Sequence, residues 1–288
     1  MINCDNQLST KPRRQIGDAV LATFNQPTYS GDTVLTLDDY QSRYESISLE
    51  RSPNGVLLVR LHTDGGPFVM TRPAHNELSQ VFYDIAADRD NRVVVLTGTG
   101  SSFSDILDSA GLSGDKTTPR GWDHVQWSAE RILTGIMDID VPVITAINGP
   151  LTIHPCWPFV GDVMLCSEDT VIQDSTHFAA GRVPGDGNNI VWEMLMGLNR
   201  SRYFLLTGQR ISAQEALSLG LVSEVLPLEN LLPRALEFAN QFAEIGDVTL
   251  RATRRALTFE LRRRVRADIG HGLAIEGLAY IDNPPVTP

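Results

Sequence analysis

The sequence has few of the features that would place a protein outside the cell or in a membrane. Only three cysteines occur among 288 residues, Cys4, Cys156 and Cys166, and their odd number and unpaired spacing suit a reducing compartment and not a disulfide framework. No apolar run is long enough to cross a bilayer, and the first residues lack the apolar core of a secretory signal. We therefore expect a cytoplasmic protein without a membrane partner.

Positive charge is also scarce. The chain has 24 Lys and Arg residues against 35 Asp and Glu residues, which gives a formal net charge of −11 at pH 7. A field of this sign repels nucleic-acid phosphates and anionic lipids, so neither is expected as the main partner. A small molecule is the expected ligand, and a hydrophobic content of 42% supplies an ordinary globular core.

Several catalytic fingerprints are missing as well. The sequence has no Gly-x-Ser-x-Gly nucleophile motif, no phosphate-binding loop and no dinucleotide-binding glycine pattern. Cys156, next to Trp157, looks more like a packing residue than a reactive thiol. These absences argue against covalent and redox chemistry, and we expect neither a cofactor nor a metal.

The chain divides into three regions by its patterns. Residues 1–43 lack helical or strand periodicity and are expected to form an extension, either disordered or packed as an arm over a neighbouring subunit. Residues 44–225 alternate strands and helices, which predicts an α/β core with largely parallel pairing, and residues 226–288 are expected to be helical. The expected strands are 47–49, 55–61, 92–98, 142–147, 163–165 and 171–172, and the expected helices of the core are 73–87 and 122–137.

Two histidine segments carry the strongest chemical signals. His154 follows a predicted strand, and if Pro155 opens a helix, the histidine lies at a helix N-terminus that favours an oxyanion. His177 precedes Asp186 in a glycine-rich loop, and an imidazole held by a carboxylate is a competent general base near neutral pH. Taken singly, His154 could equally cap a helix or lie in the core, and Pro-Gly-Asp-Gly is also an ordinary turn sequence.

Glu276 and His75 are weaker candidates. Glu276 lies in a C-terminal helical stretch, where a buried carboxylate would need a partner, although a solvated helix face explains it equally well. His75, at the start of the first long predicted helix, either lines the same pocket or is structural.

Parts of the chain resemble the enoyl-CoA hydratase/isomerase (crotonase) superfamily in order and spacing. The matching segments are 93–104, 141–150, 181–187 and 201–222, and the resemblance extends from about residue 44 to the end. It implies an α/β fold, a crotonase-like superhelix of repeated ββα turns with a helical C-terminal oligomerisation region. It also implies a homotrimer or a dimer of trimers.

Departures from the CoA-dependent members are informative. Ile153-His154-Pro155 replaces the triple-glycine stretch that supplies their second oxyanion amide, and His177 replaces the hydratase-type catalytic glutamate. Both changes, with Asp186, resemble the pattern of 6-oxocamphor hydrolase and related β-diketone hydrolases, which cleave by a retro-Claisen reaction without CoA. His75 and Glu276 match that pattern too.

The resemblance also implies the site. It gives catalytic roles to His177, Asp186 and His154, and a substrate pocket that includes His75, Met70, Glu276, Leu107 and Trp157. Met70 stands where the family's carbonyl-binding tryptophan is expected, and methionine cannot donate a hydrogen bond.

The expected function is hydrolysis of a carbon–carbon bond in a (bi)cyclic β-diketone substrate to give a keto acid. One alternative is a lyase, hydratase or cyclisation enzyme acting on a CoA ester or a polyketide-like substrate, and another is a non-catalytic scaffold. A zinc site at His154, His177 and Asp186 is a further possibility, although their spacing fits no standard zinc motif.

Overall fold

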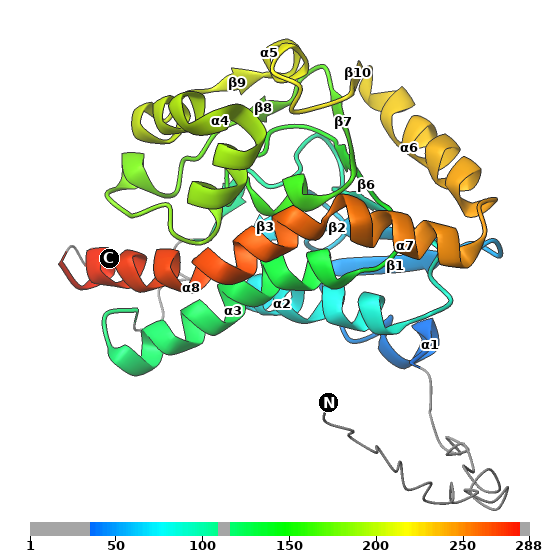
Figure 1. Cartoon of the computed structure of the whole chain (residues 1–288), viewed down its shortest axis with the longest axis horizontal. Coiled ribbons are helices and arrows are strands. Elements are labelled where there is room, and N and C mark those ends of the chain that lie inside the picture. The colour runs from blue at the N-terminus through cyan, green and yellow to red at the C-terminus, as the bar shows by residue number, and fades with distance from the viewer. Residues whose placement is uncertain (1–34, 109–115, 283–288) are drawn as a thin grey trace, which may run out of the picture. The chain divides into compact units, whose positions relative to one another are not determined.

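The computed structural model describes residues 35–108 and 116–282. A six-stranded sheet forms the centre of this part of the chain, with the strand order β1-β2-β4-β6-β7-β10 (Figure 1). Its strands are β1 (Ile47–Arg51), β2 (Val56–Leu61), β4 (Val93–Thr97), β6 (Val143–Ile147), β7 (Val163–Ser167) and β10 (Glu224–Leu226). Only β1 and β2 pair antiparallel, and the remaining neighbours are parallel.

Two short sheets extend this core. Strand β3 (Val69–Met70) pairs in parallel with β5 (Ile106–Leu107), which places Met70 opposite Leu107. Strand β8 (Val171–Ile172) pairs antiparallel with β9 (Ile211–Ser212). Loops between these strands carry the candidate site residues.

Helices cover both faces of the central sheet (Figure 1). They are α1 (Leu37–Tyr40), α2 (Arg72–Ala87), α3 (Pro119–Asp138), α4 (Asn188–Thr207), α5 (Ala213–Ser218), α6 (Leu228–Ala243), α7 (Asp247–Leu257) and α8 (Phe259–Asp282), with the short 3-10 helices η1 (Trp157–Val160) and η2 (Phe178–Ala180). The larger apolar core includes buried residues of α2, α3 and α8, and a second cluster fills the space between the sheet and α6. The predicted α/β architecture is therefore confirmed.

Local sequence explains where the first long helices begin. The Thr71 hydroxyl accepts a hydrogen bond from the Ala74 amide at 3.1 Å, and Thr118 caps α3 through Gly121 in the same way. A proline follows each capping threonine within the first turn, where its missing N–H removes no helical bond. Both helices were expected. Each begins at the residue after its capping threonine, before the first of the regularly spaced apolar residues that the helix buries.

The last residues of the expected N-terminal extension fold with the core. Residues 1–34 lie outside the described part, whereas α1 packs its Tyr40 side chain fully inside the main core. The Tyr40 hydroxyl donates to Asp88 at 2.9 Å, and Asn91 donates to the same hydroxyl at 3.2 Å. At least this end of the extension belongs to the core.

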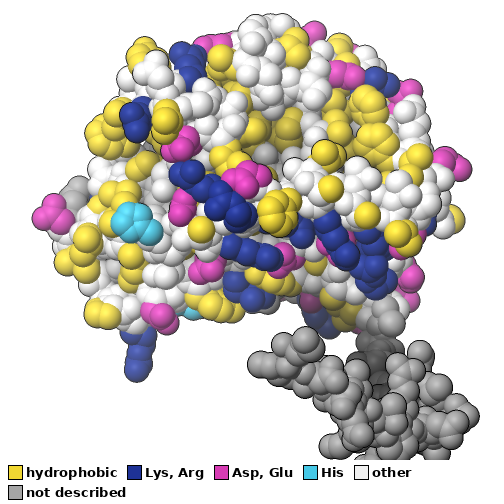
Figure 2. Space-filling model, viewed as in Figure 1, with side chains coloured by type: hydrophobic (Ala, Val, Ile, Leu, Met, Phe, Trp, Pro, Cys, Tyr) yellow, Lys and Arg dark blue, Asp and Glu magenta, His cyan; other side chains and the backbone are white. Residues whose placement is uncertain are grey.

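A belt of arginines lies on the surface formed by α7 and α8. Figure 2 shows it as a dark blue band across the face, interrupted by carboxylates. We define the arginine belt as the surface residues Arg255, Arg262, Arg263, Arg264 and Arg266 together with Arg254, whose side chain is buried beneath the surface. Its carboxylate partners are Asp162, Asp140, Glu260, Glu193, Asp268 and Asp138. The positive charge of the belt is thus matched locally. None of the helices in the described residues is both long and apolar enough to span a bilayer.

Candidate active site

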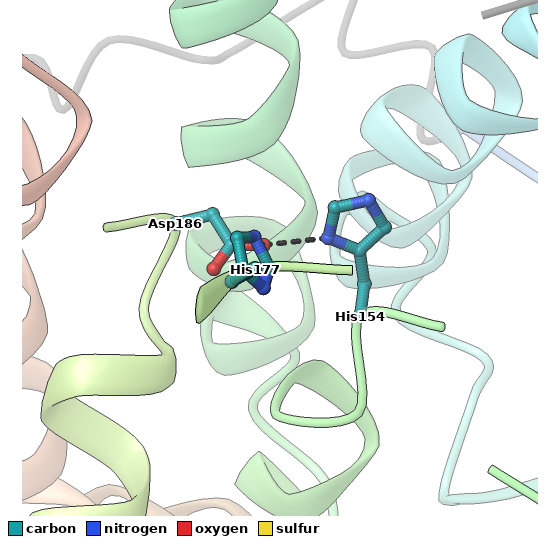
Figure 3. Close-up of side chains that lie close together, drawn as sticks. All are labelled: His154, His177 and Asp186. Atoms are coloured by element: carbon teal, nitrogen blue, oxygen red, sulfur yellow. Dashed lines mark hydrogen bonds and ion pairs between the residues drawn. The ribbon is translucent and has the colours of Figure 1, made fainter. Parts of the chain in front are cut away.

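Three loops and one helix bring the predicted side chains together (Figure 3). His154 follows β6, His177 lies between β8 and η2, and Asp186 precedes α4. Glu276 projects from α8, with its Oε1 3.9 Å from His177 Nε2. Residues more than 120 positions apart in the chain therefore form one cluster.

Backbone conformation explains how two of these loops reach the site. The backbone of His154 has φ +47°, a left-handed conformation that is uncommon for residues other than glycine. Gly185 lies so close to α8 that an added Cβ would approach the Gly272 carbonyl oxygen to 2.1 Å. The loop carrying Asp186 can meet the helix carrying Glu276 because neither contact residue has a side chain.

His177 is held between two carboxylates. Its Nδ1 lies 2.7 Å from Asp174 Oδ1, and its Nε2 lies 3.4 Å from Asp186 Oδ2. The side chains of His177 and Asp174 are almost fully buried. Burial alone would lower the pKa of His177, but Asp186 and Asp174 outweigh it and raise that pKa well above its ordinary value.

Asp186 is the centre of a second set of contacts. Its Oδ2 lies 2.7 Å from His154 Nδ1, and its Oδ1 accepts a hydrogen bond from Asn188 Nδ2 at 2.9 Å. The indole of Trp192 fixes Asn188 in turn, donating to its Oδ1 at 2.7 Å. Burial opposes the charge on Asp186, yet His177 and His154 hold the pKa of Asp186 well below its usual range.

Glu276 and His75 are buried and carry shifted pKa values. Burial, followed by the nearby charge of Asp186, raises the pKa of Glu276 to about 8. Burial and the neighbouring His154 lower the pKa of His75 to about 3, so His75 is neutral at physiological pH. The predicted solvated-face alternative for Glu276 is excluded, because only 4% of this residue is exposed.

A cavity of about 20 Å³, enough for one water molecule, lies beside the cluster. Met70, His75, His154, Trp157 and Asp186 line it, together with Ala129, Ile132, Leu133 and Cys156. Two of these side chains, His75 and Trp157, each have a buried nitrogen, Nδ1 and Nε1, with no hydrogen-bond partner in the described structure. A carbonyl-bearing ligand would complete both hydrogen bonds, although a cyclic diketone requires the lining side chains to move apart.

The structure corrects one sequence-based expectation. Pro155 does not open a helix: η1 is a four-residue 3-10 helix that begins at Trp157, so His154 is not at a helix N-terminus. Leu107 pairs with Met70, a residue of the cavity wall, and is 37% exposed; its role in a substrate pocket stays a prediction. Cys156 is buried, and burial raises the pKa of its thiol well above the ordinary value, as expected for a packing residue.

Two polar residues of the cluster were not predicted from the sequence. Asp174, not Asp186, makes the short hydrogen bond to His177, and Asn188 holds Asp186 in place. The signal for Asp174 was its position three residues before His177, a spacing at which a carboxylate can turn back onto an imidazole. It was hidden in Gln173-Asp-Ser-Thr, a polar run typical of loops.

Three residues of the cluster could also hold a cation. His154, His177 and Asp186 offer ligand atoms within 4.8 Å of one another. Histidine nitrogens and a carboxylate oxygen are the ligand types that zinc prefers. Nδ1 of each histidine is already within 2.7 Å of a carboxylate, which leaves Nε2 of each as the ring nitrogen for a metal or a substrate.

Comparisons with known proteins place the chain among crotonase-fold enzymes. The sequence matches the family described as enoyl-CoA hydratase/isomerase over residues 51–271. The structure of a β-diketone hydrolase from the cyanobacterium Anabaena sp., bound to (S)-3-oxocyclohexyl acetic acid, is 45% identical with a TM-score of 0.83, over 85% of this chain and 97% of that chain. A short-chain-enoyl-CoA hydratase from Clostridium acetobutylicum is 24% identical over 71% of this chain and 76% of its own.

The fold itself recurs more widely. An enoyl-CoA hydratase/isomerase structure from Mycobacterium paratuberculosis has a TM-score of 0.75 at 24% identity, over 82% of this chain and 94% of that chain. At this level of identity the likeness shows a shared fold and says nothing of a shared reaction.

Proposed function

The chain belongs to the enoyl-CoA hydratase/isomerase family, and we propose that it is a CoA-independent hydrolase that cleaves a carbon–carbon bond of a cyclic β-diketone. The observation that carries this proposal is the buried imidazole of His177, placed between two carboxylates, one of which, Asp186, lines a cavity of water size. The 45% identity to a β-diketone hydrolase supports it. The ligand of that relative carries both a ketone and a carboxylic acid, the two groups that such a cleavage produces.

The first step is addition of water. His177 Nε2 accepts a proton from a water molecule, and the water oxygen bonds to one carbonyl carbon of the diketone. The carbonyl oxygen becomes an oxyanion in a tetrahedral intermediate. Asp174 and Asp186 stabilise the imidazolium that forms, because both carboxylates already lie against the ring.

Collapse of the intermediate breaks the carbon–carbon bond. The electron pair of that bond passes to the leaving carbon, which becomes the enolate of the second carbonyl. Trp157 Nε1–H, and His75 Nδ1 in the tautomer that carries a hydrogen there, are the unpartnered donors available to hold the two oxygens. Because His154 Nδ1 donates to Asp186, His154 Nε2 donates to an oxygen only when the His154 ring is protonated. His177 then returns its proton to the leaving carbon, which gives a keto acid from a cyclic substrate and restores the neutral base.

The experiment is product analysis by mass spectrometry with a panel of bicyclic and monocyclic β-diketones in oxygen-18 water. We expect wild-type enzyme to give a keto acid with the label in its carboxylate, and His177→Ala to give none. His271→Ala, at an exposed position on α8, is the matched histidine control and should retain full activity. Turnover of every diketone at wild-type rates by His177→Ala would sink the assignment.

The main competing function is chemistry on a CoA ester, which the Clostridium relative favours by its name. Titration calorimetry with CoA and with an acyl-CoA separates the two, since we expect no binding of either. Tight CoA binding, combined with no diketone turnover, would transfer the proposal to a lyase or hydratase reaction. Unshifted histidine pKa values and no turnover of any substrate would instead indicate a non-catalytic scaffold.

We further propose that the protein assembles as a homotrimer or a dimer of trimers. Val248, Leu257 and Phe259 of the α7–α8 region are large apolar residues with at least 66% of their surface exposed. Exposed apolar residues of this kind are typical of subunit interfaces. Light scattering coupled to size-exclusion chromatography measures the assembly, and a monomer at micromolar concentration would contradict it.

A further inference from the structure

Asp174 is the residue that the resemblance gave no role and that makes the shortest contact to the proposed base. We propose that Asp174 is the positioning residue of His177, which holds the ring by its Nδ1–H so that Nε2 faces Asp186 and the reacting water. The distance from Asp174 Oδ1 to His177 Nδ1 is 2.7 Å. The catalytic consequence rests on the proposed function, whereas the hydrogen bond itself does not.

The direction of this hydrogen bond follows from the other contacts of Asp174. Its Oδ1 also lies 3.4 Å from the Thr176 amide and 3.3 Å from the Thr176 hydroxyl. The amide can only donate, and an ionised carboxylate can only accept. Nδ1 of His177 must therefore carry the hydrogen, which fixes the neutral ring as the tautomer whose free lone pair is on Nε2.

The two aspartates differ in what else they hold. Asp186 is shared: its Oδ2 is nearer to His154 Nδ1, at 2.7 Å, than to His177 Nε2, at 3.4 Å. It stands on the side of the ring where a proton must arrive. Asp174 binds the opposite nitrogen, and its Oδ2 has no hydrogen-bond partner in the described structure. We therefore assign orientation of the ring to Asp174 and contact with the reacting side to Asp186.

The segment that carries Asp174 is fixed to the segment that carries His154. The Gln173 amide donates to the Leu151 carbonyl at 3.2 Å, and the Ser175 amide and hydroxyl both donate to the Thr152 carbonyl, at 3.2 and 2.7 Å. Because these bonds flank Asp174 on both sides, its carboxylate has little freedom to follow a rotating imidazole. A rigid partner of this kind costs no reorganisation when the ring becomes charged.

The variant that tests the assignment is Asp174→Asn, with Asp169→Asn, an exposed aspartate of the preceding turn, as the matched control. An asparagine amide can donate to Nδ1 and so favour the wrong tautomer. We expect kcat for diketone cleavage to fall by about 10² to 10⁴-fold, with KM changed by less than about threefold. The pH profile should move to lower pH, because one of the carboxylates that favour the imidazolium has been removed.

Nitrogen-15 NMR of histidine-labelled protein gives a readout that needs no substrate. With His177 titrated to its neutral form, the wild-type spectrum should show a protonated Nδ1 and an unprotonated Nε2. The opposite tautomer in the wild type would overturn the proposal, whether or not Asp174→Asn folds. So would a variant with wild-type kcat and pH profile.

A merely structural role for Asp174 predicts a different result. The variant would then lose thermal stability or active fraction, with no shift of the pH profile and no change of tautomer in the molecules that remain folded. Failure of the proposed function is distinguishable from both, since wild-type enzyme would turn over no diketone while the NMR spectrum still reported the Asp174 hydrogen bond.

Discussion

The active-site cluster and the arginine belt both bring opposite charges within a few ångströms, but they differ in exposure to water. The side chains of His177 and Asp186 are 2% and 8% exposed, whereas those of Arg263 and Glu260 are 57% and 61% exposed. Water screens the second pair and leaves it a small effect, while the first pair shifts the protonation of both partners strongly. Burial, and not the number of ion pairs, marks the region that can carry acid–base chemistry.

The largest effect should come from removing the base. We expect His177→Ala and His177→Gln to lower kcat by about 10³-fold or more, since general-base catalysis contributes about 10² to 10⁴-fold and the charged ring is lost as well. Steady-state kinetics with the best diketone of the panel measures the effect. Circular dichroism checks the fold. A correctly folded His177→Gln with wild-type kcat would contradict the claim that the buried cluster, unlike the arginine belt, carries acid–base chemistry.

A buried member of the arginine belt tests the same comparison through stability. Arg254 is almost fully buried and pairs with Asp162 at 2.6 Å, besides donating to the Met137 carbonyl in the last turn of α3. Arg254→Ala should cost about 3 to 5 kcal/mol of unfolding free energy, because it leaves Asp162 without its charged partner. Urea denaturation measures this, and kcat per folded molecule should not change.

The pH dependence should separate activity from stability. Because the neutral form of His177 is the base and its pKa is raised, kcat/KM should rise with pH by about tenfold per unit until that pKa is passed. A raised histidine pKa contributes stability that is complete below the unfolded value and is lost as pH rises through the folded value. Activity and thermal stability should therefore move in opposite directions as the pH rises above the ordinary histidine value of about 6.5.

Glu276 should add to the alkaline loss of stability. Its pKa of about 8 in the folded protein exceeds the ordinary carboxyl value, so folding favours the protonated acid and stability falls as pH rises from about 4.5 to 8. Glu276→Gln removes the ionisable group and should flatten the melting temperature between these limits. An unchanged slope in differential scanning calorimetry would count against a buried, protonated Glu276.

The smallest effects on stability and on activity should come from replacing an exposed arginine of the belt and from removing metal ions. Arg263→Ala breaks only a solvated pair, and we expect no measurable change in melting temperature.

Dialysis against EDTA should leave kcat unchanged, because the proposed steps use His154 and His177 as proton and oxygen contacts and not as metal ligands. If activity were lost and zinc restored it, His154 and His177 would instead be metal ligands.

Much of the fold and most of the cluster could be predicted from the sequence. Periodicity located five of the six strands of the central sheet and missed β10 (Glu224–Leu226). The resemblance brought His154, His177 and Asp186 to one site, where the structure also places them. What could not be predicted was which carboxylate binds which nitrogen. Asp174 and Asp186 are both loop aspartates near His177 in sequence, and only the packing of their loops decides that Asp174 meets Nδ1.

The course of the chain around Pro155 was mispredicted for a related reason. A proline after a strand often opens an α-helix, but the left-handed backbone of His154 turns the chain so that only one short 3-10 turn follows. Such a conformation is set by tertiary contacts. No local pattern in Asn148-Gly-Pro distinguishes it from an ordinary turn.

The approach of Gly185 to Gly272 also orders events in time. The loop that carries Asp186 lies against α8, the last helix of the described chain. During synthesis from the N-terminus, the ribosome completes β6, β8 and α4 long before it releases α8. The loop that carries Asp186 can therefore gain its contact with α8 only after the other segments of the site have been synthesised.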